Sequence, residues 1–490
     1  MKKLFVFLTP LLFLAACKKD LTSLNEDPKN PSSVPSFALY TNAQRTLSNT
    51  LTSSSVNLNI FRLIVQYWTE TTYTDESNYD LQTRQIPRGV WNALYRDVLR
   101  DLQETKKLIP TDVLDGTGKP DAPRQKNQLA VVDITEVYAW YYLVTTFGNV
   151  PYSEALNIDK PFPKYDDQKA IFTDLLKRID ADIAAIVITG ESFGNADVIY
   201  GGDMEAWKKF AASLKLKMGM TLADSDPALS KTIVEAAVAT GVFTSNADNA
   251  EFKYLSGPPN TNPVWVDLVQ SGRKDFVGTT TIIDGLKALN DPRLPYYFTL
   301  DGTGNEYTGG EPGASNNYTT YSKPSGSSLV KGSIGRITSA DFPALLMDYS
   351  EVEFFLAEAK ERGYNVPITA GEHYNKAITA SILYWGGSST QAVNYLAQPA
   401  VAYATAAGDY KQKIGVQKYL GLYNRGWDEW IEQRRLDQPA IIAPSSAQSV
   451  YPVRFTYNVD EQNINTANYN AASTAIGGDK VGTKLFWDKN

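Results

Sequence analysis

Apolar side chains recur at helical spacing along this chain, and four long blocks fit the helical template. In residues 87–109 the positions i, i+3, i+4 and i+7 are apolar or aromatic, while polar side chains fall elsewhere. This face consists of Trp91, Leu94, Tyr95, Val98, Leu99 and Leu102. Such a stripe predicts an amphipathic helix with one side in the core.

Three further blocks follow the same pattern. Residues 125–147 carry Ile134, Val137, Tyr138, Tyr141 and Tyr142. Residues 203–222 carry Trp207, Phe210, Ala211, Leu214 and Met218, and we expect their solvated face to consist of Lys208, Lys209, Lys215 and Lys217. Residues 345–362 carry Val352, Phe355, Leu356 and Ala359, and Gly363 follows as a C-terminal stop.

A capping box marks the start of the next helix. Thr369 and Glu372 have the spacing at which the two side chains satisfy each other's backbone N–H groups. About six residues then separate two amphipathic helices, which predicts an antiparallel pair. Such pairs stack into solenoids when they repeat. We therefore predict a mainly α fold, in which tetratricopeptide-like helix pairs form a solenoid scaffold.

Polar, turn-prone segments interrupt the helical blocks. Residues 256–263, 301–333 and 443–475 are rich in Gly, Ser, Asn and Tyr, and this composition is typical of loops rather than of solenoid helices. We expect these segments to be long irregular loops on one face of the scaffold. Loops held by a rigid scaffold are where binding residues usually lie, so we place ligand recognition there.

The N-terminus has the pattern of a bacterial lipoprotein signal. Lys2 and Lys3 precede an apolar run too short to span a membrane, and Leu-Ala-Ala precedes Cys17. The alternative is a buried cysteine in a leftover apolar segment, but Cys17 is the sole cysteine and follows the signal directly. We predict a signal peptide at residues 1–16, a lipidated flexible tether at 17–35 and one α-helical binding domain at 36–490.

Composition excludes several classes of function. His373 is the only histidine and Cys17 the only cysteine, so histidine-dependent triads and ordinary zinc sites lack their parts. Loss of residues 1–16 would remove two lysines and change the net charge from −7 to −9, which argues against nucleic acid as a partner. Carboxylate chemistry remains open, because a glycosidase needs only two acids. We expect no cofactor and no metal, and assign no function to His373.

The order of several motifs resembles the SusD/RagB family of outer-membrane lipoproteins from Bacteroidota, in its second SusD-like branch. The similar segments are Leu14-Ala15-Ala16-Cys17, Asn25-Glu26-Asp27-Pro28, Phe147-Gly148-Asn149-Val150-Pro151-Tyr152, Gly202-Asp203 with Trp207 and Phe210, and the run from Gln417 to Arg435. Three positions depart from the family pattern: Asn149, where Asp is usual; Asn458, where Pro is usual; and Phe486, where Trp is usual. These departures affect only local turns.

The resemblance implies a binding protein rather than an enzyme. Members of this family sit as a lid on a TonB-dependent barrel of the SusC/RagA type. They face the exterior of the outer membrane and hold an oligosaccharide or a peptide for uptake. For the run from residue 427 to 435, we favour a structural role, in which the doubled arginine holds helix ends or neighbouring carboxylates.

Two segments combine aromatic rings with short polar side chains, a mixture that suits stacking on a ligand and hydrogen bonding to it. They are residues 66–79 and 260–276. The candidate ligand-binding residues are Trp68, Tyr73, Asp75, Tyr79, Trp265, Arg273 and Asp275. Packing is the alternative for each aromatic residue, and Arg273 and Asp275 are also placed to pair with one another.

Two other functions remain open at this point. A surface-anchored α-helical glycoside hydrolase would also show aromatic residues, carboxylates and a lipid anchor, although no catalytic pair of acids can be singled out. A protein that only assembles its neighbours at the surface would bind no ligand. Neither the choice between glycan and peptide nor the ligand itself follows from loop composition.

Overall fold

The structure, a computed structural model, describes residues 34–112, 121–326 and 335–489. In its first half the elements are α2 (Ser36–Thr52), α3 (Phe61–Ile64), β1 (Trp68–Glu70), α4 (Ile86–Asn92), η1 (Ala93–Leu99), α5 (Arg100–Leu108), η2 (Ile109–Thr111), α6 (Ala122–Phe147), β2 (Val150–Pro151), β3 (Tyr165–Asp166), α7 (Gln168–Ala185), η3 (Gly194–Ala196), α8 (Met204–Thr221), α9 (Pro227–Thr240) and η4 (Asn246–Asp248). The predicted signal peptide, Cys17 and nearly all of the tether lie outside the described residues.

The second half contains β4 (Ala250–Phe252), α10 (Pro263–Trp265), η5 (Val266–Gln270), β5 (Phe276–Gly278), α11 (Thr280–Ala288), α12 (Leu294–Tyr297), β6 (Ala344–Met347), α13 (Tyr349–Glu361), α14 (Ala370–Tyr384), α15 (Ser389–Leu396), α16 (Tyr410–Gly421), α17 (Gly426–Leu436), α18 (Val459–Ile464) and α19 (Thr466–Ala475). The strands form three antiparallel pairs, β1–β5, β2–β3 and β4–β6. Among the described residues, no helix is both long and apolar enough to cross a membrane.

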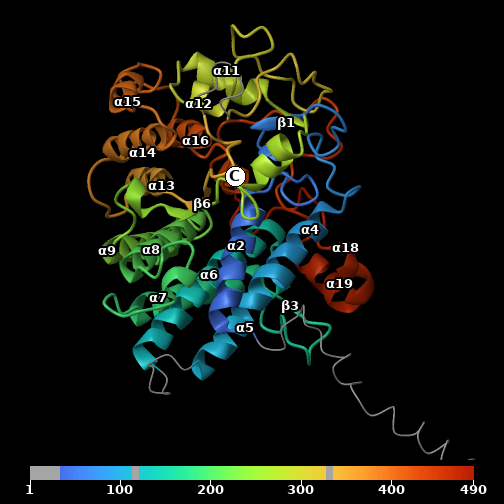
Figure 1. The fold of residues 1–490 in the computed structure, drawn as a ribbon, viewed down its shortest axis with the longest axis vertical. Coiled ribbons are helices and arrows are strands. Elements are labelled where there is room, and N and C mark those ends of the chain that lie inside the picture. The colour runs from blue at the N-terminus through green and yellow to red at the C-terminus, as the bar shows by residue number, and fades with distance from the viewer. Residues whose placement is uncertain (1–33, 113–120, 327–334, 490) are drawn as a thin grey trace, which may run out of the picture.

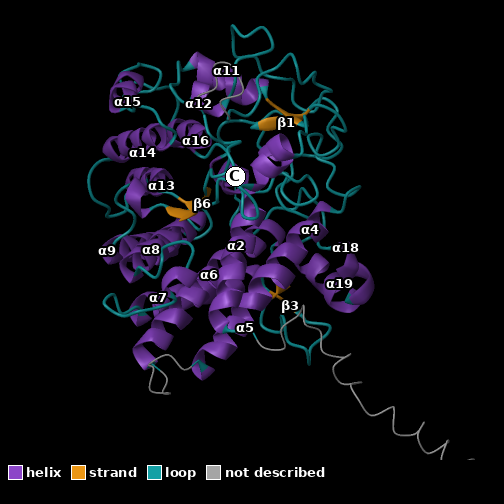
Figure 2. Cartoon of the chain, in the orientation of Figure 1, coloured by secondary structure: helices purple, strands orange, loops and turns teal. Residues whose placement is uncertain are grey.

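Consecutive helices pack against each other as hairpins, as α6 does with α7, α8 with α9, and α13 with α14. These pairs stack along one side of the molecule, from α7 through α8 and α13 to α14 (Figure 1). Irregular chain gathers beside β1, on the other side (Figure 2). The prediction of a mainly α fold with stacked helix pairs is confirmed.

Most predicted helices form where the pattern places them. Residues 86–108 are helical throughout, with a π-helical stretch at η1, and the whole predicted apolar face is buried. The block at 125–147 lies in α6, which ends at Gly148, where φ is +84°. Asp203 caps α8, and the predicted capping box of Thr369 and Glu372 opens α14.

Two predictions of local structure are wrong in part. The block at 345–362 is helical only from Tyr349, because β6 pairs with β4 and the Asp348 side chain caps α13. Residues 443–475, expected to be loop, end in the short helices α18 and α19. α19 has only one fully buried residue, Ala472, so it lacks the apolar stripe on which helix prediction depends.

The lysine face predicted for α8 is not solvated. Lys217 is 1% exposed and forms ion pairs with Glu351, at 2.9 Å, and with Asp428. Lys215 is also buried and pairs with Asp180 at 2.5 Å. α8 packs against α7, α9 and α13, so its polar side faces other helices rather than water. A pattern within one helix cannot show this, because the carboxylate partners come from elsewhere in the chain.

Charged residues also fill α17, in which all eleven residues are buried. Arg435 pairs with Glu358 at 2.5 Å and with Glu432 at 2.6 Å. Arg434 donates to the backbone carbonyl groups of Trp430, Thr145 and Val453. The structural interpretation of the doubled arginine is therefore confirmed. The buried His373 contacts Glu353 through Nδ1 and the carbonyl of Pro367 through Nε2.

We expect Lys217→Met to destabilise the protein by about 3–5 kcal/mol, because it leaves two buried carboxylates short of a cation. Lys208→Met on the same helix is the matched control. Lys208 pairs with no described carboxylate, so its replacement should change the free energy of unfolding by no more than about 0.5 kcal/mol. Urea unfolding of both variants measures the difference, and equal stability would contradict the importance of this network.

Candidate functional site

The short ribbon of β1 and β5 brings the two candidate segments together. Trp68 pairs with Gly278 and Glu70 with Phe276, although about two hundred residues separate the strands. Beyond the ribbon, the backbone N–H of Thr71 donates to the carbonyl of Asp275 at 2.8 Å, and its hydroxyl donates to the carbonyl of Lys274 at 2.7 Å. We call residues 71–80 and 266–275 the paired loops.

The scaffold fixes β1 through the turn between α16 and α17. Arg62 of α3 donates to the side chain of Asn424 at 2.8 Å and to its carbonyl at 3.1 Å. Trp68 donates through Nε1 to the hydroxyl of Tyr423 at 2.9 Å. The hydroxyl of Tyr67 reaches the carbonyl of Tyr419 at 2.6 Å. These contacts tie the start of the first paired loop to the helical core.

Five of the seven candidate residues remain at least partly exposed. Tyr73 is 80% exposed. The side chains of Asp75 and Arg273 are 43% and 56% exposed, and Trp265 is half-buried. Arg273 Nε donates to Asp275 Oδ2 at 2.5 Å, so these two residues form the pair that their spacing allowed. The paired loops thus present an aromatic ring and both signs of charge.

Trp68 and Tyr79 are each only 1% exposed. The Trp68 ring lies against Phe276, and the Tyr79 hydroxyl accepts a hydrogen bond from Gln66 at 3.3 Å. Neither ring can stack on a ligand in this conformation, and we reassign both to positioning the loops. Aromatic character in the sequence does not separate an inward ring from an outward one.

A third loop, which sequence reasoning named only as a segment, joins the paired loops. Ser315 Oγ donates to the carbonyl of Thr71 at 3.2 Å, and the N–H of Gly313 donates to the hydroxyl of Thr69 at 3.0 Å. Burial and the nearby charge of Asp275 raise the pKa of Tyr318, which is half-buried. The abundance of Tyr in residues 301–333 was the available signal for this contribution.

The backbone around the first paired loop is held in an unusual conformation. Four residues other than glycine have positive φ there: Gln66, Tyr73, Tyr79 and Gln85. Such conformations persist only where the surroundings enforce them, and they cluster at functional sites. Gln66 is enforced by hydrogen bonds from its side chain to the carbonyl of Ile442 and from the hydroxyl of Thr281.

A buried pair of carboxyl groups lies beneath the same loop. Glu70 accepts hydrogen bonds from the backbone N–H of Ser77 at 2.9 Å and from its hydroxyl at 3.0 Å. Glu76 forms an ion pair with Arg84 at 2.5 Å. Burial, together with the neighbouring Glu76, raises the pKa of Glu70 to about 8. Glu70 is therefore neutral near pH 7, and burial raises the pKa of Glu76 as well.

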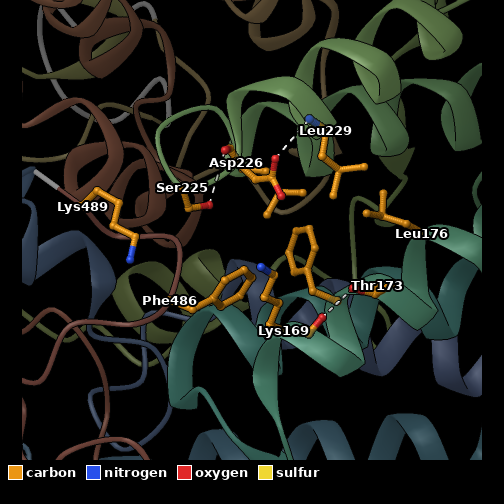
Figure 3. Close-up of a pocket in the computed structure, with 10 residues that line it drawn as sticks. Lys169, Thr173, Leu176, Ser225, Asp226, Leu229, Phe486 and Lys489 are labelled. Atoms are coloured by element: carbon orange, nitrogen blue, oxygen red, sulfur yellow. Dashed lines mark hydrogen bonds between the residues drawn. The ribbon is translucent and has the colours of Figure 1, made fainter.

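A cavity of about 160 Å³ lies elsewhere, against α7 and the turn between α8 and α9. Figure 3 shows that Phe486 of the C-terminal segment closes one side, with Lys169 and Lys489 around it. No residue of the paired loops lines this cavity. Within the described residues, no group of three or more His, Cys, Asp or Glu side chains is placed to hold a metal ion.

Glu70→Gln should gain stability relative to the unmodified protein as pH rises from about 4.5 to about 8. Over that window Glu70 is ionised in the unfolded chain and protonated in the folded chain. The free energy of unfolding of the wild type therefore falls by up to about 1.4 kcal/mol per pH unit. Urea unfolding across this range measures the effect. Glu104→Gln, at an exposed glutamate, is the control, and parallel curves for Glu70→Gln and the wild type would refute the shift.

Comparisons with known proteins agree with this architecture. The family model SusD-like_2, described as "Starch-binding associating with outer membrane", matches residues 28–458. No curated protein matches the sequence. A chitin-binding protein of known structure is 25% identical, with a TM-score of 0.78, and the match covers 93% of this chain and 100% of that one.

Two further solved structures share the fold. A chitin-binding SusD homologue from Flavobacterium johnsoniae is 22% identical, with a TM-score of 0.75 and coverage of 92% of this chain and 99% of that one. A SusD homologue from Bacteroides vulgatus is 21% identical, with a TM-score of 0.77 and coverage of 93% and 98%. The family resemblance seen in the motifs is confirmed: the chain belongs to the SusD-like family, in its second branch.

Proposed function

We propose that this protein is a surface glycan-binding lipoprotein that captures an oligosaccharide at the paired loops. The observation that carries the proposal is the β1–β5 ribbon, which places Tyr73, Arg273 and Asp275 on neighbouring, solvent-facing loops. An exposed aromatic face can stack on a sugar ring. The adjacent carboxylate and guanidinium groups can accept from and donate to its hydroxyl groups.

Two findings favour a glycan over a peptide. The family is described as starch-binding, and the solved structure with 25% identity is a chitin-binding protein. The exposed groups of the paired loops also include both signs of charge, with Arg273 already paired with Asp275. A neutral ligand rich in hydroxyl groups suits such a surface better than a ligand of fixed net charge.

The remaining parts of the proposal follow from the family and the N-terminal motif. Cys17 would carry the lipid that anchors the protein to the outer membrane, facing the exterior. Its partner would be a SusC/RagA-like TonB-dependent transporter, to which the bound glycan is delivered. The protein itself would bind without turnover, since transport needs affinity and the transporter supplies the energy coupling.

The proposed site is tested with chitin oligosaccharides, malto-oligosaccharides and a mixed peptide, by titration calorimetry with analysis of products. We expect saturable binding of one glycan class without product release. Tyr73→Ala and Arg273→Ala should each weaken it by roughly 5- to 100-fold, which corresponds to the loss of about 1–3 kcal/mol per contact residue.

Matched controls exist for both variants. Phe162 is an exposed aromatic residue away from the paired loops, and Phe162→Ala should bind normally. Arg96 pairs with its neighbour Asp97 at 2.6 Å and is 62% exposed, much like Arg273, so Arg96→Ala controls for loss of such a pair. Sustained product release would instead favour the hydrolase, peptide binding alone would change the ligand class, and no binding would favour an assembly role.

Cys17→Ser should release the protein from the outer membrane, because the thioether-linked lipid supplies its membrane affinity. Fractionation of expressing cells measures this, with the unmodified chain as control. A TonB-dependent transporter should co-purify with the anchored form after mild detergent extraction. Retention of Cys17→Ser in the membrane would contradict the lipid anchor. Failure of a TonB-dependent transporter to co-purify with the anchored protein would contradict the proposed partner.

A further inference from the structure

A small polar cavity lies at the opposite end of the molecule from the paired loops. It has a volume of about 150 Å³ and is lined by residues of η1, α5, α6, α7 and the loop after β2. In Figure 1 these elements meet near α5 and β3, whereas β1 lies near the other end of the long axis. No residue of the paired loops lines this cavity, so it is not part of the proposed capture site.

The charged groups at the cavity neutralise one another. Arg178 binds Asp133 through two donors, at 2.7 and 3.0 Å, and Glu136 at 2.6 Å. Lys106 also pairs with Asp133 and with Glu136, at 3.0 Å. The hydrogen bonds and charges of Arg178 and Lys106 outweigh burial and lower the pKa of Asp133 to about 2. Two cations thus face two carboxylates.

Two further acids, Asp182 and Asp174, lie behind this group. Burial, with the charge of Asp133, raises the pKa of Asp182 to about 9, so this residue is neutral near pH 7. Asp174 accepts a hydrogen bond from the hydroxyl of Tyr152 at 2.5 Å, and Arg178 donates to the same hydroxyl at 2.9 Å. The cavity therefore offers no excess of positive charge to an anionic ligand.

Three residues that line the cavity nevertheless keep polar groups free. Glu136 is 6% exposed, and its Oε2 takes both ion pairs, while Oε1 has no hydrogen-bond partner among the described residues. The indole N–H of Trp140 and the amide of the half-buried Gln103 likewise bond no group in the described part of the chain. An acceptor, a donor and an amide that can do both therefore surround one small space.

The rest of the wall is aromatic and apolar. Trp140 and Tyr152 lie edge to face with ring centroids 4.8 Å apart. Ala155 and Leu156 close the cavity from the loop after β2, and Leu156 is held at φ +58°. The space is smaller than the roughly 300 Å³ at which sites for drug-sized ligands begin. It has room for one small ring and not for a chain.

We propose that this cavity is a second ligand site, which binds a single neutral polyhydroxylated ring such as a monosaccharide. Glu136 Oε1 would accept from a hydroxyl group, and Gln103 and the indole N–H of Trp140 would bond the remaining hydroxyl oxygens. The aromatic wall would cover the apolar face of the ring. The site is separate from the paired loops, so this proposal does not depend on glycan capture there.

The test uses protein labelled with 5-fluorotryptophan, in which the resonance of Trp140 is assigned from Trp140→Phe. Glucose, galactose and N-acetylglucosamine are titrated separately, with the anion inorganic phosphate and the zwitterion glycine as probes that carry charged groups. We expect at least one sugar to shift the Trp140 resonance saturably and the charged probes to leave it in place. A shift with phosphate or glycine alone, or with no probe, overturns the proposal.

Two variants locate the binding. Ala155→Phe fills the cavity and should abolish the shift, whereas Ala471→Phe, at an exposed alanine, should not. Gln103→Leu should weaken binding about tenfold through loss of hydrogen bonds, with the exposed Gln462→Leu as its control. Tyr73→Ala should leave the shift unchanged. Sugar binding that survives Ala155→Phe in a folded protein, or that is lost in Tyr73→Ala, would place the ligand elsewhere.

Discussion

The buried ion pairs around the α16–α17 turn are the constraint on which the rest of the structure depends. Arg425 reaches Glu351 at 2.6 Å, Asp428 at 2.9 Å and Asp348 at 3.2 Å, and Lys217 of α8 shares two of these acids. The adjoining residues Tyr423 and Asn424 hold α3 and β1. One charged junction therefore fixes the register of the helix pairs and also supports the first of the paired loops.

Sequence predicts the helices well where a single stripe faces the core, as in the face from Trp91 to Leu102. It fails for α8, where lysines pair with acids from distant segments. Nothing near Lys217 in the sequence shows that it will pair with Glu351 or Asp428. The basic run therefore looks like a solvent-exposed helix face. The same limit applies to β6, whose strand character comes from pairing with β4 rather than from its own pattern.

The candidate site was predictable as two segments but not as a set of side chains. Aromatic and short polar residues marked both segments, and the β1–β5 ribbon joins them. Which rings point outward depends on backbone geometry, and this separates the exposed Tyr73 from the buried Trp68. The tyrosine-rich composition of residues 301–333 marked the segment of Tyr318, but its approach to the paired loops depends on contacts between distant parts of the chain. Glu70 and Glu76 lie close together in the sequence, but their burial depends on the fold around them.

The three loops around the site are joined largely through main-chain groups and through residues that point inward. The bonds of Thr71 to the carbonyl groups of Lys274 and Asp275, and of Gly313 to Thr69, involve none of the outward side chains. Outward side chains such as Arg273 are therefore free to diverge at little cost in folding energy. A frame built in this way can keep its shape while the chemistry of its exposed surface changes.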